Sequence, residues 1–421
     1  MKRTQPRQIF LDFGGTDLKF SLGSKSEPVR LNVSKLLKQI GNYKFYLASD
    51  LQEFLYKVVE KHLPLKVETH FFISTQMASA YDLTSLEETN VILSWQSRSS
   101  ADLGTVFQNA FIESGRDLRS SSPVFTVPDF LFENFNTKSH GLISLDTLGG
   151  FVADTLLGHR TKVRHCTDAF SLGAYKADIT FGRISDFARI EVPQISKEVV
   201  SLGTSELMPN ATIFAPVGDQ QTSLLGVQLS EVDICVNMGT GGQVAVLNIA
   251  NGPDSSTKAQ QRPYFDSRWL STFTHLPSGR TLSAYFLEWH KYFGGKFEDF
   301  LKLAGQEKPV SYEISSRVPI DYDEFSAVDK HLLRELLEDE SPAVLPSIVA
   351  NKFINRYEEL ILQLPDFSKR EKLVFAGGLG SRFPYMQQEL SRKLDLPLEL
   401  RATTESTING LWSIASSLEI F

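Results

Sequence analysis

The sequence predicts an α/β protein with two domains, each built around a mixed sheet. Predicted strands and amphipathic helices alternate along the whole chain. The length of 421 residues exceeds what one ordinary core holds, so two domains are expected. Two hairpins with glycine-rich turns occur, one in each half, and this repetition indicates a duplicated fold.

The first hairpin opens the chain. Residues 9–13 alternate like a strand, Gly14, Gly15 and Thr16 form a turn, and the chain returns in a second strand that carries Lys19. Asp12 then lies at a strand end. The glycines let backbone N–H groups approach an anion, a carboxylate suits Mg²⁺, and a lysine suits phosphate. The alternative is that Asp12 only ends a strand and Lys19 is solvated.

Helices and strands alternate after this hairpin. An apolar stripe of helical spacing covers residues 51–59 and leads into a strand at 70–74. A further strand is expected at 91–94, and a helix at 146–157 that ends at Gly158.

The segment around Asp219 is the most informative stretch of the chain. Asp219 follows Gly218 and opens an apolar-periodic run, so its side chain should lie at the positive end of a helix and be held as a carboxylate. Such a carboxylate can accept a proton from a hydroxyl. A helix cap without catalysis is the alternative. The second hairpin follows, with strands at 232–237 and 243–247 around a tight turn at 239–242.

The remaining elements lie in the second half. Helices are expected at 282–292 and 343–362, a strand at 373–376, and a last helix at 407–418. The polar segment 251–261 is predicted to be a flexible loop.

A glycine turn follows the strand at 373–376. Gly377, Gly378 and Ser381 connect this strand to a helix at 386–394. A strand, turn and helix in this order can cradle a nucleotide. A turn that binds nothing is the alternative.

Composition and charge argue against several classes of protein. The formal net charge of −7 gives no electrostatic reason to expect a nucleic-acid partner. Cys166 and Cys235 are far apart in sequence, which argues against a disulfide scaffold or a cysteine metal cage and fits a reducing cytoplasm. No apolar run of about 18 residues occurs. We expect no membrane span, no secretory signal and a cytoplasmic location.

Taken together, these motifs resemble those of the FGGY carbohydrate kinases of the actin-like ATPase superfamily, over nearly the whole chain. Residues 12–19 resemble the first phosphate motif, 218–221 the catalytic-base motif and 239–241 the second phosphate motif. Residues 376–381, with 405–410, resemble the adenosine motif. The order and spacing of the four motifs carry the resemblance.

The resemblance implies two actin-like, ribonuclease H-like domains with mixed sheets around a nucleotide cleft. Residues 1–229 would form the first domain and residues 230–421 the second, with the last helix close to the cleft. Each domain would present one phosphate-binding hairpin to that cleft.

The resemblance also implies in-line transfer of the γ-phosphoryl group of ATP to a sugar hydroxyl, a reaction that needs positioning, charge neutralisation and a base. Asp219 would be the general base and Asp12 the Mg²⁺ ligand. The residues implied to hold phosphates are Gly14, Gly15, Thr16, Lys19, Gly239 and Thr240. Those implied to flank the adenosine are Gly377, Gly378 and Ser381.

The sugar side matches the family less closely. Gln76 and Met77 match the end of a strand that contacts sugar in the family, but Ala78 replaces the usual His or Glu. Gln220, beside the implied base, is a further expected substrate contact. The lost polar group argues against common ketopentose substrates, because hydrogen-bonding positions dominate discrimination between polyols.

A second sugar segment is altered too. Trp95 and Arg98 resemble a Trp-x-Asp-x-Arg segment, but Ser97 stands at the Asp position and the spacing to Arg98 is one residue short. Trp95 is expected either to stack on the apolar face of a substrate or to be a core aromatic beside the strand.

Three functions are compatible with these motifs. We favour an ATP-dependent and Mg²⁺-dependent kinase, monomeric or homodimeric, that acts on a sugar or polyol. The alternatives are a nucleotide-binding sensor or scaffold of the same fold, and a related kinase for a small acid or polyol. The presence of Asp12, Asp219 and Thr240 favours the enzyme, since a sensor needs no base. The phosphate motifs report the nucleotide and not the acceptor.

Overall fold

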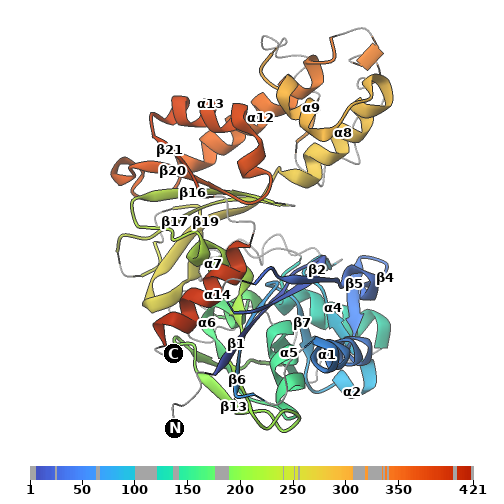
Figure 1. Ribbon diagram of the computed structural model, residues 1–421. Helices are drawn as coiled ribbons and strands as arrows, with labels where there is room; N and C mark the ends of the chain where they lie inside the picture. Colours follow the sequence, from blue (N-terminus) through green and yellow to red (C-terminus); the bar gives the residue numbers. More distant parts are fainter. Residues whose placement is uncertain are drawn as a thin grey trace.

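The computed structural model describes residues 6–23, 26–62, 67–99, 121–135, 142–175, 189–239, 241–250, 252–254, 257–306, 318–320, 334, 337–338, 341–401 and 405–418. Two lobes are visible in Figure 1: the first half of the chain forms the lower lobe and most of the second half forms the upper one. Helices α7 (Asp219–Gly226) and α14 (Ser406–Ser417) lie side by side between the sheets of the two lobes.

The main sheet of the first lobe has the strand order β13-β14-β6-β1-β2-β3, with β15 also paired to β6. Strand β1 is antiparallel to β2 but parallel to β6, so the sheet is mixed. Its strands are β1 (Arg7–Phe13), β2 (Asp17–Leu22), β3 (Val29–Asn32), β6 (Thr69–Thr75), β13 (Ser201–Thr204), β14 (Ala211–Phe214) and β15 (Val217–Gly218).

A second sheet of this lobe has the order β11-β9-β7-β8-β5-β4, and β10 pairs with β12 separately. These strands are β4 (Lys38–Ile40), β5 (Tyr43–Leu47), β7 (Ala80–Asp82), β8 (Val91–Leu93), β9 (Leu142–Thr147), β10 (Val163–His165), β11 (Arg189–Glu191) and β12 (Gln194–Ser196). The helices of the lobe, besides α7, are α1 (Ala48–His62), α2 (Leu86–Thr89), α4 (Pro123–Phe135), α5 (Leu148–Leu157) and α6 (Cys166–Ala169).

The sheet of the second lobe repeats the pattern of the first main sheet. Its order is β18-β19-β17-β16-β20-β21, with β16 antiparallel to β17 and parallel to β20. The strands are β16 (Asp233–Met238), β17 (Gly242–Leu247), β18 (Gln260–Pro263), β19 (Trp269–Leu276), β20 (Lys372–Ala376) and β21 (Leu398–Leu400). The helices are α8 (Gly279–Phe293), α9 (Phe297–Leu303), α12 (Val344–Ile361), α13 (Pro384–Leu394) and α14.

Both main sheets are buried on both of their faces. Successive residues of a strand point to opposite faces, so neighbouring residues pack in different cores. Ile234 and Val236 pack in the core under α12 and α13, whereas Cys235 faces the other way. In the first lobe, Ile9 packs in the core with α1 and α5, whereas Phe10 faces the opposite side. The two inward faces therefore meet around α7 and α14.

The contact between α7 and α14 is unusually close. A Cβ atom on Gly226 would meet the backbone of Ser406 and Gly410, and one on Gly410 would meet the backbone of Thr222. The hydroxyl groups of Ser223 and Ser406 are 2.7 Å apart. Helix α14 comes from the second half but also packs on β1 and β6, so it joins the two lobes.

The structure confirms the α/β class and the mixed sheets, and it corrects two expected elements. The helix expected at 146–157 begins only at Leu148, because Asp146 and Thr147 end strand β9 and the Thr147 hydroxyl accepts the N–H of Gly150 as a cap. The loop expected at 251–261 ends earlier, because Gln260 and Gln261 pair with β19 in strand β18.

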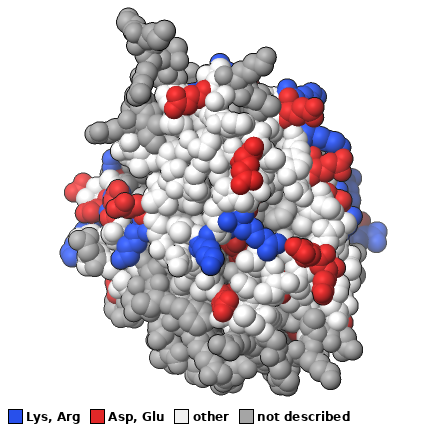
Figure 2. Space-filling model, turned by 90° about the horizontal axis from the view of Figure 1, so that it is seen from below, with Lys and Arg blue, Asp and Glu red and all other residues white. Residues whose placement is uncertain are grey.

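None of the helices in the described part of the chain combines the length and the hydropathy needed to cross a membrane. Acidic and basic side chains are interspersed on the face seen in Figure 2. That distribution offers no basic field to a polyanion on the described part of this face.

Candidate active site

A cavity of about 490 Å³ lies between the two glycine-turn hairpins. Both turns contribute to its wall, and so does the start of α7. From the first half it is lined by Asp12, Gly14, Gly15, Lys19, Gln76, Met77, Ala78, Trp95, Ser121, Ser122, Ser171, Asp219, Gln220 and Ser223. From the second half it is lined by Asn237, Gly241, Gly242, Gln243, Gln260, Gln261, Arg262, Thr274, His275 and Thr407.

Asp12 and Lys19 face each other on the first hairpin. They are directly opposite in the β1–β2 register, and the Nζ atom of Lys19 lies 3.4 Å from Oδ2 of Asp12. Lys19 also lies 3.3 Å from Oε2 of Glu405, which in turn pairs with Arg30. Burial raises the pKa of Asp12, and the charge of Lys19 opposes that rise. The hairpin thus presents a carboxylate and a cation to the cavity.

The turn of this hairpin packs tightly against Gln76 and Trp95, two of the expected sugar-binding residues. A Cβ atom on Gly15 would lie 3.3 Å from Oε1 of Gln76 and 3.5 Å from Nε1 of Trp95. Glycine therefore lets the turn approach both side chains. Thr16, by contrast, is exposed and is not part of the cavity wall; its carbonyl accepts the N–H of Val33 at 2.9 Å.

Asp219 is the first residue of α7, and Gly218 is its N-cap. Strand β15 places the residue here by pairing in parallel with the end of β6, and the N–H of Gly218 donates to Oγ1 of Thr167 at 3.0 Å. The Asp219 carboxyl accepts the N–H of Gln220 at 2.8 Å, and the nearby backbone N–H of Met77 also lowers its pKa. The side chain therefore satisfies a helical N–H, as a cap would, from inside the helix.

Burial and, next, the charge of Asp12 raise the pKa of Asp219 to about 7. The helix start alone predicts a carboxylate, but desolvation outweighs the pKa-lowering effect of the nearby backbone N–H groups. A carboxyl that titrates near neutral pH can both accept and release a proton, which suits a general base.

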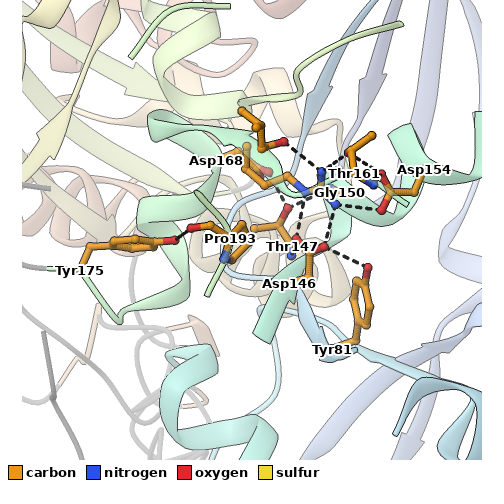
Figure 3. Close-up of polar contacts among 11 residues, drawn as sticks. Tyr81, Asp146, Thr147, Gly150, Asp154, Thr161, Asp168, Tyr175 and Pro193 are labelled. Carbon is orange, nitrogen blue, oxygen red and sulfur yellow. Dashed lines mark hydrogen bonds and ion pairs between the residues drawn. The ribbon is translucent and has the colours of Figure 1, made fainter. Parts of the chain in front are cut away.

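A buried polar network connects residues of β9, α5 and α6 (Figure 3). The Arg164 side chain is fully buried and pairs with Asp146 at 2.7 Å and Asp154 at 2.9 Å. Next to it, the Thr147 hydroxyl donates to Asp168 at 2.5 Å, and burial raises the pKa of Asp168 to about 7. The network ties β9, α5 and α6 together beneath the ends of β6 and β15.

The second hairpin presents neutral groups. Asn237 and Gln243 are opposite each other in the β16–β17 register, and both line the cavity with Gly241. Gly239 is not part of the wall, and its carbonyl accepts the N–H of Gly279 at 3.1 Å. Thr240, the other expected phosphate contact of this turn, lies outside the described residues.

The expected adenosine turn lies next to this hairpin. Strand β20 runs parallel to β16 with Ala376 opposite Asn237, so Gly377 follows at the same sheet edge. Gly377 has a φ of +81°, and a Cβ atom there would lie 2.6 Å from Oδ1 of Asn237. Gly378 and Ser381 follow in the turn, with the Ser381 hydroxyl donating to the Gly378 carbonyl at 3.3 Å. None of the three turn residues lines the cavity.

The acceptor side brings together Gln76, Met77, Trp95 and Gln220 but not Arg98. Gln76 is buried and donates from Nε2 to the Tyr46 hydroxyl at 3.2 Å, while its Oε1 has no hydrogen-bond partner among the described residues. Arg98 is exposed and is not part of the wall; its backbone N–H donates to Asn42.

Two altered positions of the sugar motifs have structural explanations. Trp95 is half-buried in the turn after β8, lines the cavity, and its ring lies 6.3 Å from that of His275. Ser97 is buried and exchanges hydrogen bonds with the backbone of Lys44, which anchors this turn to β5. Ala78 lines the cavity with a φ of +59°, a backbone conformation that residues other than glycine rarely adopt.

Sequence reasoning missed the contribution of strand β18. Arg262 lines the cavity, and it donates to Oε1 of Gln220 at 2.5 Å and to Oε1 of Gln260 at 2.7 Å. The sequence predicts a flexible loop at Gln260, whereas the structure has it in β18. Short edge strands with polar residues carry little periodicity, so no pattern pointed to this wall.

Asp12 fits Mg²⁺ as a single protein ligand rather than as part of a cage. Among the described residues there is no group of three or more His, Cys, Asp or Glu side chains that could hold a metal ion. Mg²⁺ commonly binds through one or two carboxylates together with substrate phosphates and water. A carboxylate beside a glycine turn and a lysine matches that mode.

Comparisons with known proteins agree on the fold. No protein family model and no curated protein matches the sequence. Among solved structures, xylulose kinase from Lactobacillus acidophilus matches 99% of this chain and 90% of its own, with a TM-score of 0.75 and 14% identity. Gluconate kinase from the same organism and Plasmodium falciparum glycerol kinase with ADP match the same shares, each with a TM-score of 0.73 and 14% identity. The chain therefore has the fold of these three kinases.

Proposed function

We propose that the protein is an ATP-dependent carbohydrate kinase that phosphorylates a hydroxyl of a sugar or polyol. The observation that carries the proposal is the cavity in which Asp219, with a pKa of about 7, shares one wall with Asp12, Lys19 and the turn of the first hairpin. A base, a cation and an anion-binding turn are the groups that phosphoryl transfer requires.

In the proposed reaction, ionised Asp219 takes the proton of the acceptor hydroxyl while the hydroxyl oxygen attacks the γ-phosphorus of ATP. The bond from that phosphorus to the β–γ bridging oxygen breaks, and ADP leaves. Lys19 and the backbone N–H of Gly15 would hold the phosphates, with Thr240 as a further expected contact. The N–H groups of Gly14 and Gly239, also expected to do so, donate instead to the carbonyls of Asp17 and Gly241 at 3.0 Å within their own turns. Asp12 would hold Mg²⁺, which neutralises phosphate charge when bound.

The two domains of this proposal are residues 1–229 and 230–421. The first would bind the acceptor through Gln76, Met77, Trp95 and Gln220. The second would bind the adenosine through Gly377, Gly378 and Ser381, on the strand next to the second hairpin. Arg98 is omitted from the acceptor site, because it does not line the cavity.

The amide-rich lining supports a neutral polyhydroxy acceptor. Gln76, Gln220, Gln243, Gln260 and Gln261 all border the cavity. Amide groups both donate and accept hydrogen bonds, as hydroxyl groups do. The similarity to kinases named for xylulose, gluconate and glycerol is compatible with this class but does not choose within it.

The test is a screen for ATP consumption with pentoses, hexoses, heptuloses and polyols as acceptors, in the presence of Mg²⁺. Every positive acceptor is repeated with Asp219→Asn. We expect at least one acceptor to be phosphorylated by the natural protein and much more slowly by the variant. A thermal shift with MgATP but no turnover with any acceptor would favour a nucleotide-binding sensor instead.

A further inference from the structure

Arg262 extends from the second half of the chain towards the start of α7. It lies in the edge strand β18, and one guanidinium nitrogen, Nη1, donates to Oε1 of Gln220 at 2.5 Å and lies 3.5 Å from Sδ of Met77. The other, Nη2, donates to Oε1 of Gln260 at 2.7 Å in the same strand. Arg262 therefore contacts two side chains of the first half while it is anchored in the second.

Met77 and Gln220 have a second property in common. The backbone N–H of Gln220 donates to the carboxyl of Asp219 at 2.8 Å, and the backbone N–H of Met77 lies near enough to lower the pKa of the same carboxyl. They come from different elements, since Met77 follows strand β6 and Gln220 lies in α7. Arg262 is thus in contact with both residues that hold Asp219, from the opposite lobe.

The charge of Arg262, like its contacts, favours the ionised form of Asp219. Several charged or titratable groups border the cavity: Asp12 on β1, Lys19 on β2, Asp219 on α7, Arg262 on β18 and His275 on β19. Lys19 is engaged by Asp12 and Glu405. The positive charge of Arg262 lowers the pKa of Asp219, against burial and the charge of Asp12.

We propose that Arg262 is a positioning residue for phosphoryl transfer, supplied by the second lobe, which fixes the Asp219 carboxyl by holding Met77 and Gln220. This inference rests on the proposed kinase function for its catalytic consequence. It adds that the base is complete only when the two lobes are in contact through Arg262. A planar guanidinium suits this role because it can hold several oxygens in a fixed arrangement.

Two substitutions separate the geometry from the charge. Arg262→Gln keeps a polar side chain but removes both the charge and the planar guanidinium group. Arg262→Lys keeps the charge but removes the guanidinium group. We expect Arg262→Gln to lower kcat at least about tenfold with little change in the KM for ATP, because small displacements of a catalytic group reduce turnover strongly. Arg262→Lys should give an intermediate kcat. Arg356→Gln, which removes an exposed ion pair with Glu359 on α12, is the matched control and should leave kcat unchanged.

A second measurement does not depend on turnover. Amide hydrogen exchange at Met77 and Gln220 reports directly on the two N–H groups next to the Asp219 carboxyl. We expect both amides to exchange faster in Arg262→Gln than in the natural protein or in Arg356→Gln. The melting temperature of Arg262→Gln should stay within a few degrees of that of the natural protein.

The outcomes decide between the roles. Unchanged kcat and unchanged exchange in Arg262→Gln would overturn the proposal. A lower melting temperature with higher KM for both substrates and unchanged kcat would also overturn it, since Arg262 would then only join the lobes. If the natural protein phosphorylates no acceptor, the kinase function fails, while exchange at Met77 and Gln220 still decides whether Arg262 holds Asp219.

Discussion

The two glycine-turn hairpins have the same frame but different chemistry. In the first, Asp12 and Lys19 face each other; in the second, the corresponding pair is Asn237 and Gln243. Each hairpin has a parallel neighbour, β6 or β20, that ends beside the turn. The first hairpin thus carries an Asp–Lys pair where the second carries two neutral amides.

This difference suits the highly charged nucleotide that we propose for the cavity. A second Asp and Lys in the second hairpin would add like charges on both sides of the same space, whereas amides and backbone N–H groups add donors without net charge. The start of α14 reinforces the first copy, since the side chains of Thr407 and Glu405 contact Asp12 and Lys19 respectively.

The largest expected effect is at Asp219, which has the raised pKa. Asp219→Asn keeps the size of the side chain but cannot take up a proton, so kcat should fall at least about 10²-fold. The thermal shift caused by MgATP should stay nearly intact, because the proposed nucleotide contacts are elsewhere. Full phosphorylation by this variant would mean that Asp219 only caps the helix.

The next effect compares the hairpins directly. Asp12→Asn makes the first hairpin resemble the second and should abolish most of the Mg²⁺-dependent part of the ATP thermal shift, because an amide is a poor Mg²⁺ ligand. Turnover at fixed Mg²⁺ should fall about tenfold or more. Asn237→Gln, which keeps the second hairpin neutral, is the control and should leave the Mg²⁺ dependence of the shift unchanged. Equal losses in both variants would contradict an unequal division of charge.

The pH dependence follows from the raised pKa of Asp219. A base must be ionised, so kcat should rise as the pH increases through about 7. The effect on stability has the opposite sign: the folded state favours the protonated carboxyl, so stability is lost as the pH rises from about 4 to about 7. Asp219→Asn, which stays neutral, should melt higher than the natural protein at pH 8 and similarly at pH 4. A variant that melts lower at pH 8 would contradict the raised pKa.

The smallest expected effect concerns the contact between α7 and α14. It changes stability alone. Gly410→Ala adds a Cβ atom against the backbone of Thr222 and should lower the free energy of unfolding by about 1–3 kcal/mol. Gly378→Ala, where a Cβ atom has nothing within 4 Å, is the control for thermal unfolding. A Gly410→Ala variant as stable as this control would mean that the two helices can separate easily.

Local patterns predicted both hairpins well. Alternating apolar residues and glycines identify strands that pair with each other, and these are the strands on which Asp12 and Lys19 face each other. The strand before Gly377 and the helix after it were also anticipated. These features depend on neighbours in sequence, so a single sequence contains them.

Features set by distant contacts could not be predicted in this way. Asp146 ends a strand rather than starting a helix because it faces Arg164, and nothing local specifies that pairing. Arg262 belongs to the cavity only because an edge strand pairs with β19. The raised pKa of Asp219 likewise results from burial between two lobes, whereas its local position at a helix start favours the charged form.

Helix α14 has a consequence for the order of events during synthesis. Ile408 and Leu411 of this helix pack in one apolar cluster with Phe10 and Phe72 of the first sheet. When the first half leaves the ribosome, that face of its sheet has no α14 to cover it until residues 406–417 have been made. The first lobe therefore cannot finish folding as an independent N-terminal unit, and we expect chaperones to meet it with this aromatic face exposed.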